Sequence, residues 1–152
     1  MHRDLARKHL DKRLSQWKPT SNFASPPRGW IRAIRDAIGM TAAQLAIRLN
    51  VSQPRVFALE KSEVNEALTL ETISRVAQAL DCTFVYAIVP NTSLEDIVTK
   101  QAQKKVSERL IRIDHTMKLE GQGLSDAEIT AEHERLMNEL MKGNLRGLWD
   151  KS

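Results

Sequence analysis

A carboxylate and a hydroxyl at the end of a predicted helix could act on the ionic site of a partner. The stretch TMKLEG, residues 116–121, ends a helical pattern. At 100° per residue, Glu120 falls on the apolar face that Ile113 and Met117 define, and Thr116 lies beside it. A carboxylate on a face buried in the protein's own core would be costly. We therefore expect Glu120 to project into a partner that offers a cation, and Gly121 to end the helix.

A second group of polar side chains, in the stretch VSQPRV, could read DNA bases. Gln53 can pair bidentately with adenine and Arg55 with guanine. Ser52 is a predicted N-cap, and Pro54 falls in the first helical turn, where its missing N–H costs little. Phosphates could be held by the basic side chains of Arg28 and Arg32, which precede this stretch. The start of another predicted helix, at Thr41, could hold a phosphate as well.

Other chemistry finds little support. The four histidines have no ligand spacing with Cys82 or with carboxylates, so we expect no metal site. A nucleophile–base set and a glycine-rich phosphate loop are both missing, so we predict neither an enzyme nor a cofactor. The sequence lacks an apolar run of membrane-spanning length, and its first residues are charged. With a single cysteine, these features predict a cytoplasmic protein that does not enter a membrane.

Charge is divided unevenly along the chain. The net charge is +4, but the first 61 residues contain twelve basic and four acidic side chains. The remaining residues contain eleven basic and fifteen acidic side chains. A basic front half indicates that this part meets a polyanion.

The DNA-reading residues need short helices to position them. Leu5, Leu10, Leu14 and Trp17 share roughly one face of a predicted N-terminal helix, which a linker rich in Pro and Ser follows. Helical spacing then predicts short helices within residues 30–39, 41–49, 52–62 and 69–81. The second and third flank a tight turn, with Ala46 at their crossing and Val51 in the turn. This is the layout of a helix-turn-helix.

Residues 82–89, CTFVYAIV, break the helical period and predict one short strand. A lone strand leaves its backbone groups unpaired, and the simplest partner is the same strand of a second chain. We therefore predict a homodimer with an inter-subunit sheet. Its contacts would come from Phe84, Val85, Tyr86 and Ile88.

The last third of the chain predicts a helical hairpin. A long helix begins after a capping pair, Ser93 and Asp96, and carries an apolar stripe from Leu94 to Met117. Ser125 and Glu128 predict the start of a last helix. Because a DNA-binding module needs little beyond residue 90, we expect this hairpin to bind a partner through the stripe, with Glu120 at its tip.

The predicted fold is therefore mainly α: a helix-turn-helix bundle with one short strand, followed by a C-terminal helical hairpin. We predict three segments. Residues 1–27 form the N-terminal helix and linker, residues 28–90 the DNA-binding and dimerising module, and residues 91–152 the helical partner-binding module.

The stretch MTAAQLAIRLNVSQPRVFALEKS resembles the Cro/C1-type repressor family. The resemblance implies a bundle whose second helix of the pair enters the major groove. That family usually has a phosphate-binding glutamine directly after the threonine that opens the first helix. Here that position is Ala42, and a glutamine follows at Gln44, which becomes the candidate for this contact.

The stretch TMKLEG is similar to the inhibitory signature of Fic-domain regulation: Ser or Thr, three residues, Glu, then Gly or Asn. The resemblance implies that Glu120 enters the ATP site of a Fic-domain AMP-transferase toxin and pairs with an arginine there, with Thr116 and Gly121 completing the signature. Nearly the whole chain also resembles the mobile mystery protein A family, in LDKRL, PPRGWIRAIRDAIGMT, VSQPRV, ALDCTFVYAIVP, HTMKLE and LWD. Members of that family are typically encoded beside a Fic-domain protein.

These features together predict an antitoxin that inhibits a Fic toxin and represses its own operon. Two alternatives stay open. The protein could be a stand-alone repressor whose C-terminal helices only mediate oligomerisation, or an antitoxin that blocks another toxin sterically.

Overall fold

The computed structural model describes residues 2–150 and divides the chain into two compact units. One unit comprises Trp17–Val89. The other joins the chain up to Gln16 to the chain from Pro90 onward. No helix within residues 2–150 combines the length and the apolar character that crossing a membrane requires.

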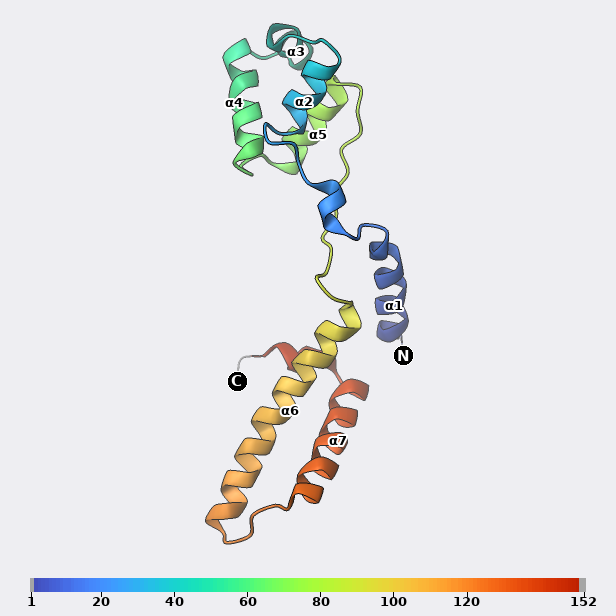
Figure 1. Ribbon diagram of the computed structural model, residues 1–152, viewed down its shortest axis with the longest axis vertical. Coiled ribbons are helices and arrows are strands. Elements are labelled where there is room, and N and C mark those ends of the chain that lie inside the picture. The colour runs from blue at the N-terminus through green and yellow to red at the C-terminus, as the bar shows by residue number, and fades with distance from the viewer. Residues whose placement is uncertain (1, 151–152) are drawn as a thin grey trace. The chain divides into compact units, whose positions relative to one another are not determined.

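The first unit, residues 17–89, is a cluster of short helices. A 3-10 helix, η1 (Thr20–Phe23), precedes α2 (Trp30–Ala37), α3 (Ala42–Leu49), α4 (Gln53–Val64) and α5 (Leu70–Ala79), as Figure 1 shows. Thr41 and Thr69 cap α3 and α5 through their hydroxyls, which accept the N–H groups of Gln44 and Thr72. These caps satisfy N–H groups that the first helical turn leaves unpaired.

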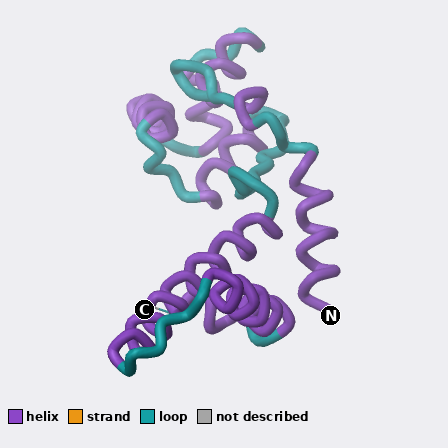
Figure 2. Tube along the Cα trace, turned by 60° about the horizontal axis from the view of Figure 1, so that its bottom comes forward, coloured by secondary structure: helices purple, strands orange, loops and turns teal. Residues whose placement is uncertain are grey.

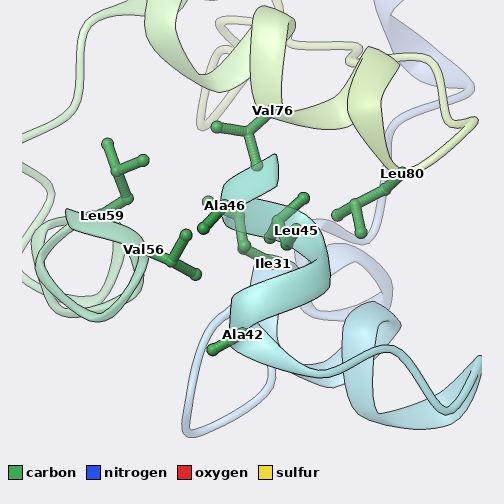
Figure 3. Packing of buried hydrophobic residues seen from close by; sticks show 8 residues of the cluster. All are labelled: Ile31, Ala42, Leu45, Ala46, Val56, Leu59, Val76 and Leu80. Atoms are coloured by element: carbon green, nitrogen blue, oxygen red, sulfur yellow. The ribbon is translucent and has the colours of Figure 1, made fainter. Parts of the chain in front are cut away.

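The core of this unit draws on each of the helices α2 to α5. Figure 3 shows Leu45 and Ala46 of α3 at its centre, facing side chains of the neighbouring helices. Leu45, Val56 and Val76 are fully buried. The remaining buried members of the cluster are Ile31, Ala42, Ala46, Leu59 and Leu80. Ala46, predicted at the helix crossing, and Val51, predicted in the turn, both pack in this core.

Two carboxylates of α4, one in an ion pair and one at a helix cap, tie α2 to α4. Arg35 Nε donates to Glu60 Oε1 over 2.7 Å, with about 8% and 6% of the two side chains exposed. This hydrogen bond to Glu60 raises the pKa of Arg35. Glu63 accepts the N–H groups of Trp30 and Ile31, over 2.7 and 3.0 Å, and so caps α2. The basic and acidic groups of α2 and α4 therefore fix the crossing of the two helices.

The strand predicted for residues 82–89 is absent from the described chain. Figure 2 draws the connection between α5 and α6 as loop, and no residue from 82 to 90 belongs to a strand or a helix. A strand is defined by ladder hydrogen bonds, and the other described residues offer this segment no second strand. The sequence prediction of a strand in the single chain is therefore wrong.

The second unit is built on a long helix. α6 (Leu94–Leu119) runs beside α7 (Asp126–Lys142) as a hairpin, and the 3-10 helix η2 (Leu145–Trp149) returns to α6. The two predicted capping boxes are confirmed, with Ser93 and Ser125 bonding the backbone N–H groups of Asp96 and Glu128. Capping therefore defines where both helices begin.

The apolar stripe of α6 packs within the chain. Val98 and Ala102 form a buried cluster with Leu148 of η2, while Val106 and Leu110 form another with Leu136 of α7. The prediction that the stripe from Leu94 to Met117 is a docking face is therefore wrong over most of its length. The two ends of the stripe lie outside these clusters: Leu94 and Ile97 at its start, and Ile113 and Met117 at its end.

The N-terminal helix α1 (His2–Ser15) packs on α6, and polar side chains make the contacts between them. Arg7 Nε lies 2.9 Å from Glu95 Oε2, and Asp11 accepts the N–H of Leu94 over 2.8 Å. Leu5 and Leu10, which the sequence placed on an apolar face, are 56% and 46% exposed. The contact is polar because Arg7 and Asp11 recur at helical spacing on the face that meets α6.

Candidate functional sites

A tight turn joins α3 to α4. Asn50 ends α3 in the left-handed region, with φ 55° and ψ 46°, a conformation that asparagine tolerates better than most residues. The N–H of Val51 donates to the carbonyl of Ala46 over 2.9 Å, and Val51 packs against the core. This turn fixes the direction in which α4 leaves, and it therefore positions the first residues of α4.

The predicted base-reading side chains meet at the start of α4. Ser52, Gln53, Pro54 and Arg55 are consecutive and all exposed. Ser52 occupies the N-cap position, with φ −78° and ψ 156°, but its hydroxyl makes no capping hydrogen bond. Pro54 lies in the first turn, as predicted. A hydroxyl, an amide and a guanidinium are thus presented together on a rigid helix start, where they can donate to base edges or phosphates.

The candidate phosphate contacts lie at two places. Gln44 completes the cap of α3, since its side-chain oxygen accepts the N–H of Thr41 over 2.8 Å. This bond uses the acceptor of the Gln44 amide, and the amide nitrogen can still donate to a phosphate. Ala42 is buried in the core, and an alanine side chain has no group that could bond a phosphate. Arg28 is exposed, and Arg32 lies 3.6 Å from Asp36 while remaining 39% exposed.

A surface hollow of about 340 Å³ joins Arg28 and Arg32 to the exposed side of α4. Phe57 and Lys61, which the sequence reasoning missed, line the same hollow. Phe57 is 49% exposed although it is a large aromatic residue. The signal available in the sequence was its position four residues after Gln53, which places both on one side of a helix.

The predicted inhibitory residues lie at the end of α6. Glu120 is the C-cap, and the chain turns at Gly121 with φ +78°. The N–H of Gln122 donates to the carbonyl of Met117 over 2.8 Å, and that of Gly121 to Lys118 over 3.1 Å. These two bonds form a Schellman motif, which needs a residue in the left-handed region. Backbone conformation therefore favours glycine at position 121, whereas space does not, since no atom stands within 4 Å of a Cβ added there.

Glu120 itself is exposed, so its carboxylate is not desolvated in the chain. Thr116, one turn earlier, is also exposed, and its hydroxyl donates to the carbonyl of Arg112 over 2.9 Å. Beside them Arg109, Arg112 and Ile113 line a shallow hollow of about 270 Å³ with Thr116 and Met117. The end of α6 thus combines a free carboxylate, a hydroxyl and partly covered apolar side chains.

The predicted dimer contacts lie in the loop after α5. Val85, Tyr86 and Ile88 are 65%, 66% and 87% exposed, and the rings of Phe84 and Tyr86 stack at a centroid distance of 5.9 Å. Phe84 and Val85 also line an apolar hollow of about 550 Å³. Its other aromatic lining residues are Trp17, Phe23 and Trp30.

Within residues 2–150, no cluster of three His, Cys, Asp or Glu side chains could hold a metal ion.

Comparison with known proteins identifies one domain. The family model described as Helix-turn-helix matches residues 31–86, which span α2 to α5 and the start of the following loop. These residues form a helix-turn-helix domain of the Cro/C1 type, and such a domain suggests DNA-binding transcription regulation. No curated protein and no solved structure matches the chain.

Proposed function

We propose that residues 28–90 bind operator DNA and repress transcription. The observation that carries this proposal is the exposed set Ser52, Gln53 and Arg55 at the start of α4, inside a helix-turn-helix domain. The start of α4 enters the major groove and its side chains read base edges. Arg28, Arg32, the amide nitrogen of Gln44 and the helix start at Thr41 contact phosphates on the flanks.

Replacing Arg55 tests the base-reading role. The full chain is used to select binding sites from a random duplex library, and binding to the selected site and its single-base variants is then measured at fixed salt. Arg55→Ala should relax the preference at one base pair by roughly 1–3 kcal/mol. Arg75→Ala is the matched control, because it removes the same charge from an exposed position of α5. An unchanged preference in Arg55→Ala would assign base reading to other residues.

A homodimer would give the DNA module two recognition helices. The exposed apolar side chains of the loop after α5 support this part of the proposal, because pairing with the same segment of a second copy would supply the missing ladder partners. Sedimentation equilibrium should then show a dimer at micromolar concentration. Ile88→Asp should shift the protein to a monomer, since it places a charge in the interface. A monomeric unaltered chain would exclude this interface.

We further propose that the end of α6 inhibits a Fic-domain AMP-transferase toxin. Glu120 enters the ATP site of the toxin and pairs with an arginine that would otherwise hold a phosphate of ATP. A desolvated carboxylate–guanidinium pair is strong enough to compete for that arginine. Support comes from the exposed carboxylate at a helix end that the Schellman motif holds rigidly, together with the exposed hydroxyl of Thr116 one turn earlier.

Substitution of Glu120 tests this mechanism in the complex with the co-expressed toxin. Glu120→Gly should release AMP transfer while leaving complex formation largely intact. Glu120→Gln, which keeps the shape and removes the charge, should release it as well. Glu134→Gln changes a carboxylate of α7 that is also exposed and should leave the toxin silent. If the toxin also stays silent in both Glu120 variants, inhibition is steric or the protein is a stand-alone repressor.

A further inference from the structure

The hollow beside α4 presents positive charge around an exposed aromatic ring. Its basic side chains are Arg28, Arg32 and Lys61, and its apolar ones include Phe57 and Val64. The acidic side chain in its lining, Glu60, is 5% exposed and is bonded to Arg35 over 2.7 Å. Asp36 lies 3.6 Å from Arg32 but not in the lining. The hollow is therefore complementary to a polyanion.

Phe57 lies one helical turn beyond Gln53 on the same side of α4. Residues four apart on a helix are neighbours on its surface, so a ligand that meets Gln53 passes close to Phe57. An aromatic ring that is 49% exposed gains free energy when an apolar group covers it. In the major groove of DNA, the apolar group that differs between base pairs is the C5-methyl group of thymine.

We propose that Phe57 reads a thymine by contact with its C5-methyl group, next to the base pair that Gln53 contacts. This inference rests on the proposed DNA-binding function and adds a specificity-determining residue to it. Arg28, Arg32 and Lys61 hold the neighbouring phosphates and bring the strand against the ring. The contact is apolar, so it adds sequence preference without adding a charge.

The experiment removes the methyl group from the DNA and the ring from the protein in turn. Sites are selected with the full chain from a random duplex library, and each dT of the selected site is replaced singly by dU. One methyl group corresponds to about a fourfold change in Kd. The unaltered chain should lose about fourfold at one dT position of each half-site. Phe57→Ala should bind dT and dU at that position equally.

Controls separate this contact from loss of fold and from electrostatics. Leu70→Ala truncates a similarly exposed apolar side chain, 53% exposed at the start of α5, and should keep the methyl dependence. If Phe57→Ala does not fold, Phe57→Leu takes its place in the experiment. Phe57→Leu keeps an apolar group and should retain part of the methyl effect. Lys61→Ala should reduce the salt slope of binding by about one, whereas Phe57→Ala should leave the slope unchanged.

Three results would overturn the inference. In the first, the unaltered chain is indifferent to dU at every position. In the second, Phe57→Ala keeps the full methyl dependence, which would place the ring against a sugar or away from DNA. Both leave the DNA-binding function in place, because a site was selected. The third is that no sequence is enriched at all, which overturns the proposed function together with this inference.

Discussion

Residues 17–89 gather four helices around one apolar core, whereas the helical hairpin spreads its buried side chains along α6 in two small clusters. The first arrangement encloses a charged pair, Arg35 and Glu60, and leaves the start of α4 as a short exposed surface on a rigid body. The second leaves Ile113 and Met117, near the end of a long helix, outside both clusters. A compact cluster thus suits the reading of a rigid groove, and an extended helix suits insertion into a partner's site.

The largest effect is expected where charge is buried. Glu60→Ala should lower the free energy of unfolding of residues 17–89 by about 3–5 kcal/mol, because it removes the buried carboxylate that faces the buried guanidinium of Arg35. Hydrogen exchange of amides in α2 to α5 of the full chain measures this free energy. Asp36→Ala is the control, since Asp36 also contacts Arg35, over 2.9 Å, but is 55% exposed.

The control should cost less than about 1 kcal/mol, as exposed ion pairs usually do. Equal losses in the Glu60 and Asp36 variants would mean that burial does not distinguish the two contacts. The difference between residues 17–89 and the helical hairpin would then lie in their apolar packing alone.

A smaller but still large effect is expected in the hairpin. Leu136→Ala should destabilise it by about 2–5 kcal/mol, because Leu136 is 1% exposed and packs against Val106 and Leu110. Leu119→Ala, at a position that is 77% exposed, should change stability by less than about 0.5 kcal/mol. Hydrogen exchange of amides in α6 and α7 reports both. A small loss in Leu136→Ala would show that the cluster of Val106, Leu110 and Leu136 contributes little to the stability of the hairpin.

Local features of both units were predictable from the sequence. Thr41, Ser93 and Ser125 cap helices as predicted, because a cap involves residues three apart. The turn at Val51 was predictable too, because its hydrogen bond to Ala46 also joins residues that are close in the sequence. The start of α4 then follows, since its exposed residues are consecutive in the chain.

Contacts between distant residues were not predictable. The stripe of α6 has the same spacing whether its own hairpin or a partner covers it, so periodicity could not assign Val106 and Leu110 to the chain's core. Hydrophobic spacing in α1 pointed to Leu5 and Leu10, while the actual contact is the polar pair Arg7 and Glu95. A strand needs a second strand to form its ladder. The hollow beside Phe57 exists only because the chain before α2 meets α4.

The smallest expected effect is a difference in pH dependence between a helix cap of each unit, at the starts of α3 and α7. The cap of α3 pairs Thr41 with Gln44, which does not titrate, whereas the cap of α7 pairs Ser125 with Glu128. Hydrogen bonds from the N–H and hydroxyl of Ser125 lower the pKa of Glu128. The carboxylate therefore stabilises the start of α7 fully above the ordinary pKa of glutamate, and this contribution is lost as pH falls through the lowered pKa.

Acidification should thus loosen the start of α7 and leave the start of α3 unchanged. NMR titration of the Glu128 carboxyl and of the Ser125 amide should give a common midpoint below the usual glutamate value, while the amide of Thr41 should show no such midpoint. Glu128→Gln should abolish the pH dependence of the Ser125 amide while keeping a hydrogen-bond acceptor in place. A Glu128 midpoint at or above the usual value would mean that its bonds to Ser125 are not held in solution. The start of α7 would then depend on packing along α6, and the difference between the two caps would carry no pH dependence.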